Sequence, residues 1–255
     1  MSRLAVRPFI NSIHINGTGS QSIAISNFEP SGGAGATLSV MQWVRVPYGF
    51  AAGCSMSKFD YGVTKRAWTV LVNAYKFRVI VSQDGGITNW KVYDSPNRID
   101  TNIWQMIGFT WNSGTLKLFI DGVEITPVKT SDAAITTIHQ NDRRVMIGCQ
   151  LAANNPVTNW SGKIGASWIW SDVLTPTEVT NLYRHGVVPR DNLQGEWLFT
   201  EGSGATLADT SGNGRNGVIA SATWSTDTAF KARMASANRV AATNRAAATH
   251  RVPVS

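Results

Sequence analysis

The chain has 255 residues, of which 43% are hydrophobic, and it contains 23 glycines and ten tryptophans. This length suits one large β-sandwich or two small domains, and no run of 18 apolar residues is present that would span a membrane. The formal net charge is +7, but residues 229–255 hold five basic residues and no acidic one, which leaves 18 basic and 16 acidic residues in the first 228. The body is therefore nearly neutral, and its aromatic residues are not interleaved with Lys and Arg, which argues against nucleic acid as a partner.

Short strands are predicted along the first half of the chain. Residues 13–15 and 22–25 alternate in polarity on either side of Gly17-Thr18-Gly19, which predicts a β-hairpin. A strand at 37–46 contains Trp43 and precedes a turn at Pro47-Tyr48-Gly49, which leads into a strand around Cys54. Further strands are predicted at 68–72 and 77–81, around the turn Asn73-Ala74-Tyr75, and at 90–93.

The middle of the chain predicts a second series of strands. Strands at 104–111 and 116–120 flank a turn, and the dipeptide Asp121-Gly122 favours a type I′ turn before a strand at 123–128. A polar stretch at 131–144 leads to a strand at 145–149, and residues 150–159 are predicted to form a loop at the rim.

A strand followed by one capped helix is predicted at 162–186, GKIGASWIWSDVLTPTEVTNLYRHG. The alternation of Ile164, Ala166, Trp168 and Trp170 with polar residues indicates a half-buried strand. Thr175 is an expected N-cap with Pro176 at the first helical position and Glu178 three residues on, a capping box, and Gly186 is expected to end the helix.

These motifs resemble the laminin-G-like, concanavalin A-type jelly rolls, and among them the pentraxin-like branch. The strand–helix unit matches the family's closing element, Trp104 opens a segment similar to its central hairpin, and Trp43 lies on a segment similar to its early core strand, pointing inward. The resemblance covers roughly residues 12–183 and implies an all-β fold: a two-sheet antiparallel jelly-roll sandwich with one short helix.

Four regions are predicted. Residues 1–10 form an N-terminal arm or edge strand, 11–190 the jelly roll, 191–228 extra strands added to the same sandwich, and 229–255 an extended basic arm. The arm contains three imperfect six-residue copies, whose even period keeps their arginines on one side of an extended chain, whereas a helix would scatter them. Its expected partner-binding residues are Lys231, Arg233, Arg239, Arg245 and Arg251.

No catalytic site is predicted. The glucanase pattern E-x-D-x-x-E does not occur, the four histidines stand singly in the sequence, and there is no G-x-S-x-G. Cys54 and Cys149 are interpreted as buried, reduced thiols without a zinc site.

The resemblance implies calcium at the sandwich rim, but the loop that would bind it offers Gln150, Asn154 and Asn155 and no carboxylate. No cofactor and no metal ligand is therefore predicted. A calcium site built from Asp60, Asp84 or Asp94 is left as an alternative.

Glycan binding requires aromatic side chains exposed beside polar groups. Trp90, Trp160 and Tyr48 lie in or next to predicted loops and are the candidates, with Asn154 and Asn155 as polar neighbours. The alternative is that these aromatic residues cover sheet edges or face a partner subunit.

Two functions follow from these features. The absence of a signal sequence in MSRLAVRPFINSIHING, the lectin-like body and the basic arm favour a non-catalytic virion protein of a bacteriophage, a head decoration or a fibre or tail component, made in the host cytoplasm. Its expected partners are other virion proteins, further copies of itself and a cell-surface glycan, and neither membrane nor nucleic acid. The alternative is a carbohydrate-binding lectin or adhesin module.

Overall fold

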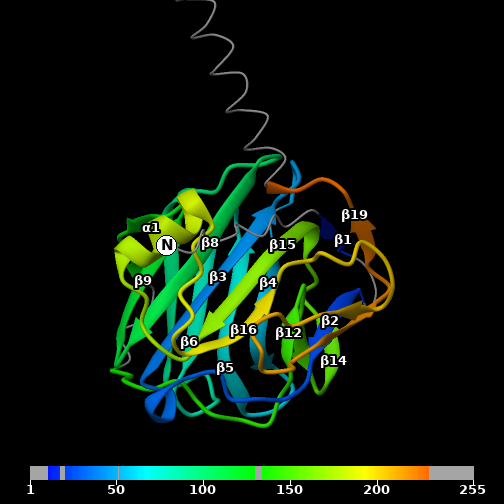
Figure 1. The fold of residues 1–255 in the computed structure, drawn as a ribbon. Helices are drawn as coiled ribbons and strands as arrows, with labels where there is room; N and C mark the ends of the chain where they lie inside the picture. Colours follow the sequence, from blue (N-terminus) through cyan, green and yellow to red (C-terminus); the bar gives the residue numbers. More distant parts are fainter. Residues whose placement is uncertain (1–10, 18–20, 51, 130–133, 230–255) are drawn as a thin grey trace, which may run out of the picture.

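The computed structural model describes residues 11–17, 21–50, 52–129 and 134–229, which form two β-sheets packed face to face (Figure 1). Sheet A contains, from one edge to the other, β10 (Val123–Ile125), β9 (Thr115–Ile120), β8 (Trp104–Asn112), β3 (Thr37–Arg45), β15 (Ser161–Trp170), β1 (Ser12–Asn16) and β19 (Thr223–Ser225), and β16 (Leu193–Trp197) also pairs with β15. The predicted arms at 1–10 and 230–255, with Lys231, Arg233, Arg239, Arg245 and Arg251, lie outside the described residues.

Sheet B is the larger of the two. It contains, in order, β11 (Val128–Lys129), β7 (Trp90–Arg98), β6 (Lys76–Ser82), β5 (Lys65–Asn73), β4 (Ala52–Asp60), β12 (Val145–Ile147), β2 (Ser22–Ile25), β18 (Gly217–Ala220) and β17 (Thr206–Leu207), while β13 (Gln150–Ala152) pairs with β4 and with β14 (Asn155–Val157). A short 3₁₀ turn, η1 (Gly33–Gly35), precedes β3. The predicted antiparallel two-sheet sandwich is confirmed, although β13 pairs with β4 in parallel and Cys54 forms a parallel bridge with Asn159.

The main core lies between the sheets. Sheet A contributes buried side chains such as Val40 and Phe109, and sheet B contributes Trp68, Val70 and Tyr93. Trp68 and Phe109 meet across the interface with ring centroids 6.2 Å apart. Burial of this apolar surface is the main stabilising contribution to the fold.

A second core lies on the outer face of sheet A, beneath the helix α1 (Pro176–His185), which crosses the sheet in Figure 1. The predicted capping box of Thr175 and Glu178 is present, and Gly186 ends the helix at φ 65°. Trp43 is buried as expected but belongs to this outer cluster, where it stacks on Tyr183 at 5.5 Å, rather than to the core between the sheets.

Strand β15 is buried on both faces rather than on one. Eight of its ten residues are buried. Ile164 and Ile169 face the main core, whereas Ala166, Trp168 and Trp170 face the outer cluster. An irregularity in the register with β3 between residues 164 and 167 changes which face the alternate side chains occupy. The prediction of a half-buried strand is wrong because α1 and the C-terminal strands cover the outer face.

The predicted hairpin of residues 13–15 and 22–25 is also wrong. Strand β1 pairs with β15 and β19 in sheet A, while β2 pairs with β12 and β18 in sheet B. The alternation that suggests a hairpin is equally satisfied here, because Ile13 and Ile23 enter the core from opposite sheets.

The strands after α1 join both sheets. β16 and β19 extend sheet A, and β17 and β18 extend sheet B. The chain then places Thr228 and Ala229, both 1% exposed, against the body, with Ala229 in the outer cluster of sheet A.

Two buried polar features brace sheet B. The Lys58 ammonium is fully buried and donates to Asn27 Oδ1 and the carbonyl of Phe28, both at 3.0 Å, and to the carbonyl of Arg143 at 2.7 Å, which matches its three protons to three acceptors. Cys54 and Cys149 are free and buried, as predicted, and burial raises the pKa of both thiols.

Candidate functional site: an aromatic pocket between three loops

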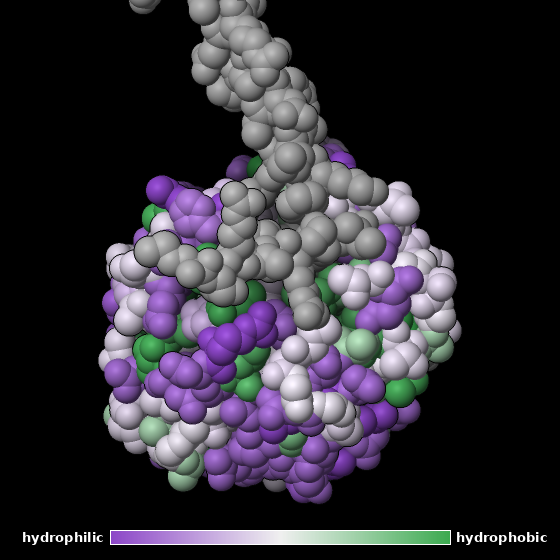
Figure 2. All heavy atoms as spheres, in the orientation of Figure 1, coloured by the Kyte–Doolittle hydropathy of each residue, from purple (hydrophilic) through white to green (hydrophobic). Residues whose placement is uncertain are grey.

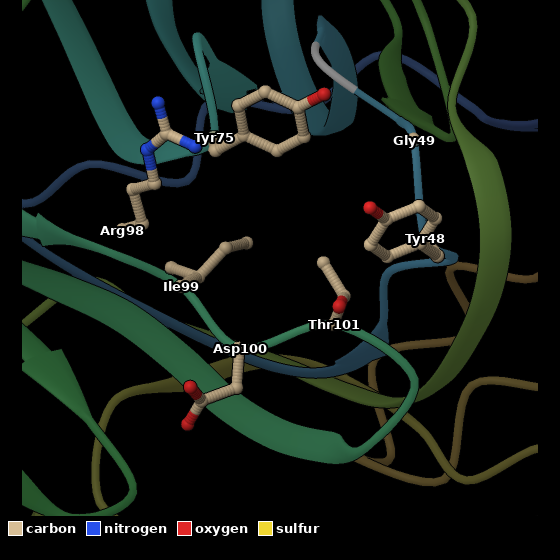
Figure 3. A pocket seen from close by; sticks show the side chains of 7 residues that line it. All are labelled: Tyr48, Gly49, Tyr75, Arg98, Ile99, Asp100 and Thr101. Atoms are coloured by element: carbon tan, nitrogen blue, oxygen red, sulfur yellow. The ribbon is translucent and has the colours of Figure 1, made fainter.

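The part of the surface that is coloured in Figure 2 shows no broad apolar patch. Hydrophobic atoms occupy small, separate areas among hydrophilic ones (Figure 2). A pocket of about 320 Å³ lies instead at one end of the sandwich, between the loops that join β3 to β4, β5 to β6 and β7 to β8 (Figure 3). Its lining consists of Tyr48, Gly49, Tyr75, Arg98, Ile99, Asp100 and Thr101.

Tyr48 stands on a tight turn between β3 and β4. The amide of Phe50 donates to the carbonyl of Pro47 at 3.3 Å, and Gly49 has φ 81°, which is the geometry of a type II turn and favours glycine at that position. The turn leaves Tyr48 86% exposed, with its hydroxyl directed across the pocket in Figure 3. The ring thus has an apolar face open to solvent and a hydroxyl at its edge, both accessible to a ligand.

Tyr75 stands on the second loop. Ala74 and Tyr75 both have positive φ, 48° and 65°, so the two-residue turn is of type I′ and presents Tyr75 at its tip. The carbonyl of Tyr75 accepts from the amide of Ile99 at 2.9 Å, which ties the second loop to the third. The ring therefore has a defined position relative to the segment 98–101.

Arg98 and Asp100 are the charged residues of the lining, and they point in different directions. The Arg98 guanidinium carbon lies 4.8 Å from the centroid of the Tyr75 ring, a cation–π contact. The Asp100 side chain points away from the pocket in Figure 3 and accepts from Gln105 Nε2 at 3.4 Å. Ile99, which also belongs to the main core, and Thr101, on the side of Tyr48 in Figure 3, complete the lining.

The third loop is braced from behind by Arg45. Its Nε donates to the carbonyl of Asn102 at 3.0 Å, and the amide of Asn102 donates to the carbonyl of Val46 at 2.7 Å. Arg45 also pairs with Asp227, which accepts from Lys163 at 2.7 Å and from the indole of Trp104 at 3.1 Å. The pocket loop and the last described segment of the chain are thus fixed by one charged cluster.

The structure separates the glycan-binding candidates of the sequence. Tyr48 lines the pocket, but Asn154 lies at the far end of β4, where its amide donates to Asp60 at 3.1 Å, and the exposed Asn155 follows it. Because Tyr48 precedes β4 and Asp60 ends this nine-residue strand, the two places are about 27 Å apart along the strand. These residues do not form one site.

Trp160 is fully buried in the main core, so its prediction as a binding residue is wrong. It packs edge-on against Phe50, with ring centroids 5.3 Å apart. The predicted rim loop is in fact the hairpin β13–β14, after which the chain turns inward. Trp90 is half-buried and packs against the outer face of sheet B.

Sequence reasoning missed Tyr75, Arg98, Asp100 and Thr101. The turn at Asn73-Ala74-Tyr75 is predicted from the sequence. An aromatic residue within a predicted turn is the pattern that could have identified Tyr75 as a candidate. Arg98 and Thr101 carry no such signal, because the pocket is assembled from loops that are remote in sequence.

The aspartates considered as calcium ligands are each engaged by the protein itself. Asp60 accepts from three backbone amides and lies 3.1 Å from the Arg143 Nε, Asp94 pairs with Arg78 at 2.6 Å, and Asp84 accepts from the Gly86 amide at 2.8 Å. The Gly86 amide contributes most to lowering the pKa of Asp84. Within the described residues no three His, Cys, Asp or Glu side chains converge on one point, and no helix is long and apolar enough to cross a membrane.

A model of the family described as Laminin_G_3, concanavalin A-like lectin/glucanases superfamily, matches residues 16–180. The chain belongs to this family. No curated protein matches it significantly. Among solved structures, a "putative carbohydrate binding protein" from Bacteroides ovatus is similar, with a TM-score of 0.63 and 15% identity over 86% of this chain, which spans 60% of that protein.

The native heptameric SAP-like pentraxin from Limulus polyphemus is also similar to this concanavalin A-like domain. Its TM-score is 0.57 and its identity 15%, over 86% of this chain and 98% of the pentraxin chain. At this identity the likeness concerns the fold, and it confirms the expected resemblance to the pentraxin-like branch.

Proposed function

We propose that this chain is a non-catalytic carbohydrate-binding module whose glycan occupies the pocket formed by Tyr48, Tyr75 and Thr101. The observation that carries the proposal is that two tyrosines, one of them 86% exposed, meet at a hollow of about 320 Å³ with hydroxyl and charged groups beside them. Sugar rings have apolar C–H faces and polar hydroxyl edges, which suit aromatic rings flanked by a few hydrogen-bonding groups.

The three loops of the pocket are held in place by hydrogen bonds. Tyr48 and Tyr75 stand on tight turns with defined hydrogen bonds, and the third loop is fixed by Arg45. Such preorganisation reduces the entropy that is lost when a ligand binds. Family membership, and the carbohydrate binding named for the Bacteroides ovatus protein, support the same proposal.

The test is a glycan array probed with the full-length protein, followed by titration calorimetry of the glycans that bind. Tyr48→Ala and Tyr75→Ala are expected to weaken binding by about tenfold or more, equivalent to ~1.4 kcal/mol. Ile87→Ala is the matched control, because Ile87 is 60% exposed but lies in the loop at the other end of β6. Failure of the protein to bind any glycan, or wild-type affinity in both tyrosine variants, would refute the proposal.

The virion role expected from the sequence stays a prediction, since the basic arm on which it depends lies outside the described residues. The same holds for assembly with further copies of the chain. Glycan binding is preferred because it rests on residues of the described body.

A further inference from the structure

We propose that the pocket is specific for glycans that carry a carboxylate, and that Arg98 is the residue that recognises it. This inference rests on the proposed glycan-binding function and adds the class of ligand.

Arg98 has a free guanidinium. Within the described residues it has neither an ion-pair partner nor a hydrogen-bond acceptor, and its contact is with the Tyr75 ring at 4.8 Å. Six other arginines of the body donate to an oxygen of the protein: Arg45, Arg66, Arg78, Arg143, Arg190 and Arg215. Arg144 has no such acceptor among the described residues either, but it lies at the other end of β4, away from the pocket. The charge of Arg98 is therefore available to a ligand.

Stacking on Tyr75 also orients that charge. A guanidinium held beside an aromatic ring keeps the N–H groups at its edge directed away from the ring, and it loses little further freedom when it binds. Two N–H groups of a guanidinium match the two oxygens of a carboxylate, and such paired, charge-assisted hydrogen bonds are among the strongest in proteins. A neutral hydroxyl offers only one uncharged oxygen, so its hydrogen bond to the guanidinium is weaker.

Asp100, the acidic residue of the lining, is hydrogen-bonded to Gln105 and not to Arg98. Asp100 lines the same pocket, but its carboxylate accepts from Gln105 Nε2 at 3.4 Å and its amide donates to Gln105 Oε1 at 2.9 Å. Gln105 is buried, with 6% exposure, so this exchange fixes Asp100 in the direction seen in Figure 3, away from the hollow. The positive charge at the rim is not neutralised from within the pocket.

A second cation stands beside Arg98. Lys76 is directly opposite Arg98 in the pairing of β6 with β7, so the two side chains leave the same face of sheet B. In the described part of the chain Lys76 also has no ion-pair partner. Two adjacent cations repel each other, and a ligand carboxylate between or beside them would offset this repulsion by its attraction to both.

The experiment compares acidic and neutral forms of the same glycan. Full-length protein is probed on an array of neutral, carboxylated and sulfated glycans, and the best carboxylated ligand is titrated beside its methyl ester, which has nearly the same shape without the charge. The acid is expected to bind at least about tenfold more tightly than the ester. Added salt is expected to narrow that difference, because exposed charges are screened.

Variants of Arg98 test the assignment to this side chain. Arg98→Gln is expected to remove the preference for the acid, so that acid and ester bind this variant with nearly equal affinity. Arg98→Lys is expected to keep only part of the preference, because an ammonium does not pair with both oxygens. Arg144→Gln is the matched control: this exposed arginine lies at the other end of β4 and is expected to change neither affinity.

The outcomes separate this inference from the proposed function. Equal binding of acid and ester, tighter binding of sulfated or neutral glycans, or an unchanged preference in Arg98→Gln would overturn the carboxylate assignment. If Tyr48→Ala loses glycan binding in such a case, the pocket is still the glycan site and the proposed function stands. If no glycan binds at all, the proposed function fails and this inference fails with it.

Discussion

Asp227 attaches the last described segment to the body through several hydrogen bonds and ion pairs. Its carboxylate accepts from Arg45, from Lys163 at 2.7 Å and from the Trp104 indole at 3.1 Å, and its carbonyl accepts from Ser12 Oγ at 2.6 Å. Replacement by Ala leaves two neighbouring cations and an indole N–H without their acceptor. We therefore expect Asp227→Ala to destabilise the fold.

The magnitude follows from the exposure of these groups. Hydrogen bonds to charged groups are worth ~1.5–3 kcal/mol when buried, and exposed ion pairs ~0–1 kcal/mol. The side chains of Asp227 and Arg45 are 32% and 34% exposed, so solvent screens their pairing and the lower range applies to the two ion pairs. Together the three contacts give about 2 kcal/mol, which for a domain of this size lowers the Tm by about 4–8 °C.

The contribution of Asp227 depends on pH. Burial acts to raise the pKa of its carboxyl, but the hydrogen bonds from Lys163 and Trp104, with the charges of Lys163 and Arg45, outweigh burial and lower the pKa. A lowered pKa means that the stabilisation is fully present above the ordinary Asp value of about 3.9, and is lost as the pH falls below it through the folded value. The stability gap between wild type and Asp227→Asn is therefore expected at pH 7 and should shrink toward pH 2.

Thermal unfolding followed by circular dichroism, at several pH values, measures this effect. Asp191→Ala is the control, because Asp191 is exposed and its substitution is expected to change stability by less than about 0.5 kcal/mol. A Tm of Asp227→Ala equal to that of wild type at pH 7, or a gap between wild type and Asp227→Asn that stays constant on acidification, would refute the reasoning.

Three other predictions concern the rest of the body. Lys58→Met is expected to cost about 3 kcal/mol in chemical denaturation, because three acceptors lose the fully buried donor that joins them. Lys65→Met at the surface should cost under about 1 kcal/mol, and similar losses in the two variants would count against the Lys58 network. Trp43→Ala and Trp168→Ala should each destabilise by about 3–5 kcal/mol, and a Tm within a degree or two of wild type would show that the outer cluster of sheet A is not a true core. Chelation of divalent ions should leave the Tm unchanged, since the sequence predicts no metal ligand, and a large decrease would reveal a metal site.

The sequence predicted those parts of the fold that depend on neighbours along the chain. The capping box of Thr175 and Glu178 and the left-handed end at Gly186 are determined by hydrogen bonds and sterics within a few residues, and both are present. The turn at Asp121-Gly122 is of the same kind, with both φ values positive, 51° and 79°. The family resemblance supplied the two-sheet arrangement on top of these local features.

Features that depend on distant partners were not predictable in the same way. The pattern of residues 13–15 and 22–25 fits a hairpin as well as two strands in opposite sheets, and only the competing strands β15 and β12 decide between them. Trp160 follows an exposed turn, yet its ring enters the core beside Phe50. The sequence indicated Tyr48 correctly because the exposure of its turn is a local property.

The site was only partly accessible from the sequence for the same reason. Tyr75, Arg98 and Thr101 come together with Tyr48 through the loops of both sheets, and no spacing in the chain records that meeting. The free guanidinium of Arg98 is a still more indirect property, because it depends on the orientation of Asp100 toward Gln105.

The central claim is that the pocket of Tyr48 and Tyr75 binds glycan. The most direct measurement is calorimetric titration of wild type, Tyr48→Ala, Tyr75→Ala and Ile87→Ala with the best ligand found on the array, alongside a thermal melt of each protein. The account predicts unchanged folding in all four, wild-type affinity in Ile87→Ala, and about tenfold or greater loss in both tyrosine variants. Folded tyrosine variants that bind the glycan as tightly as wild type would contradict it.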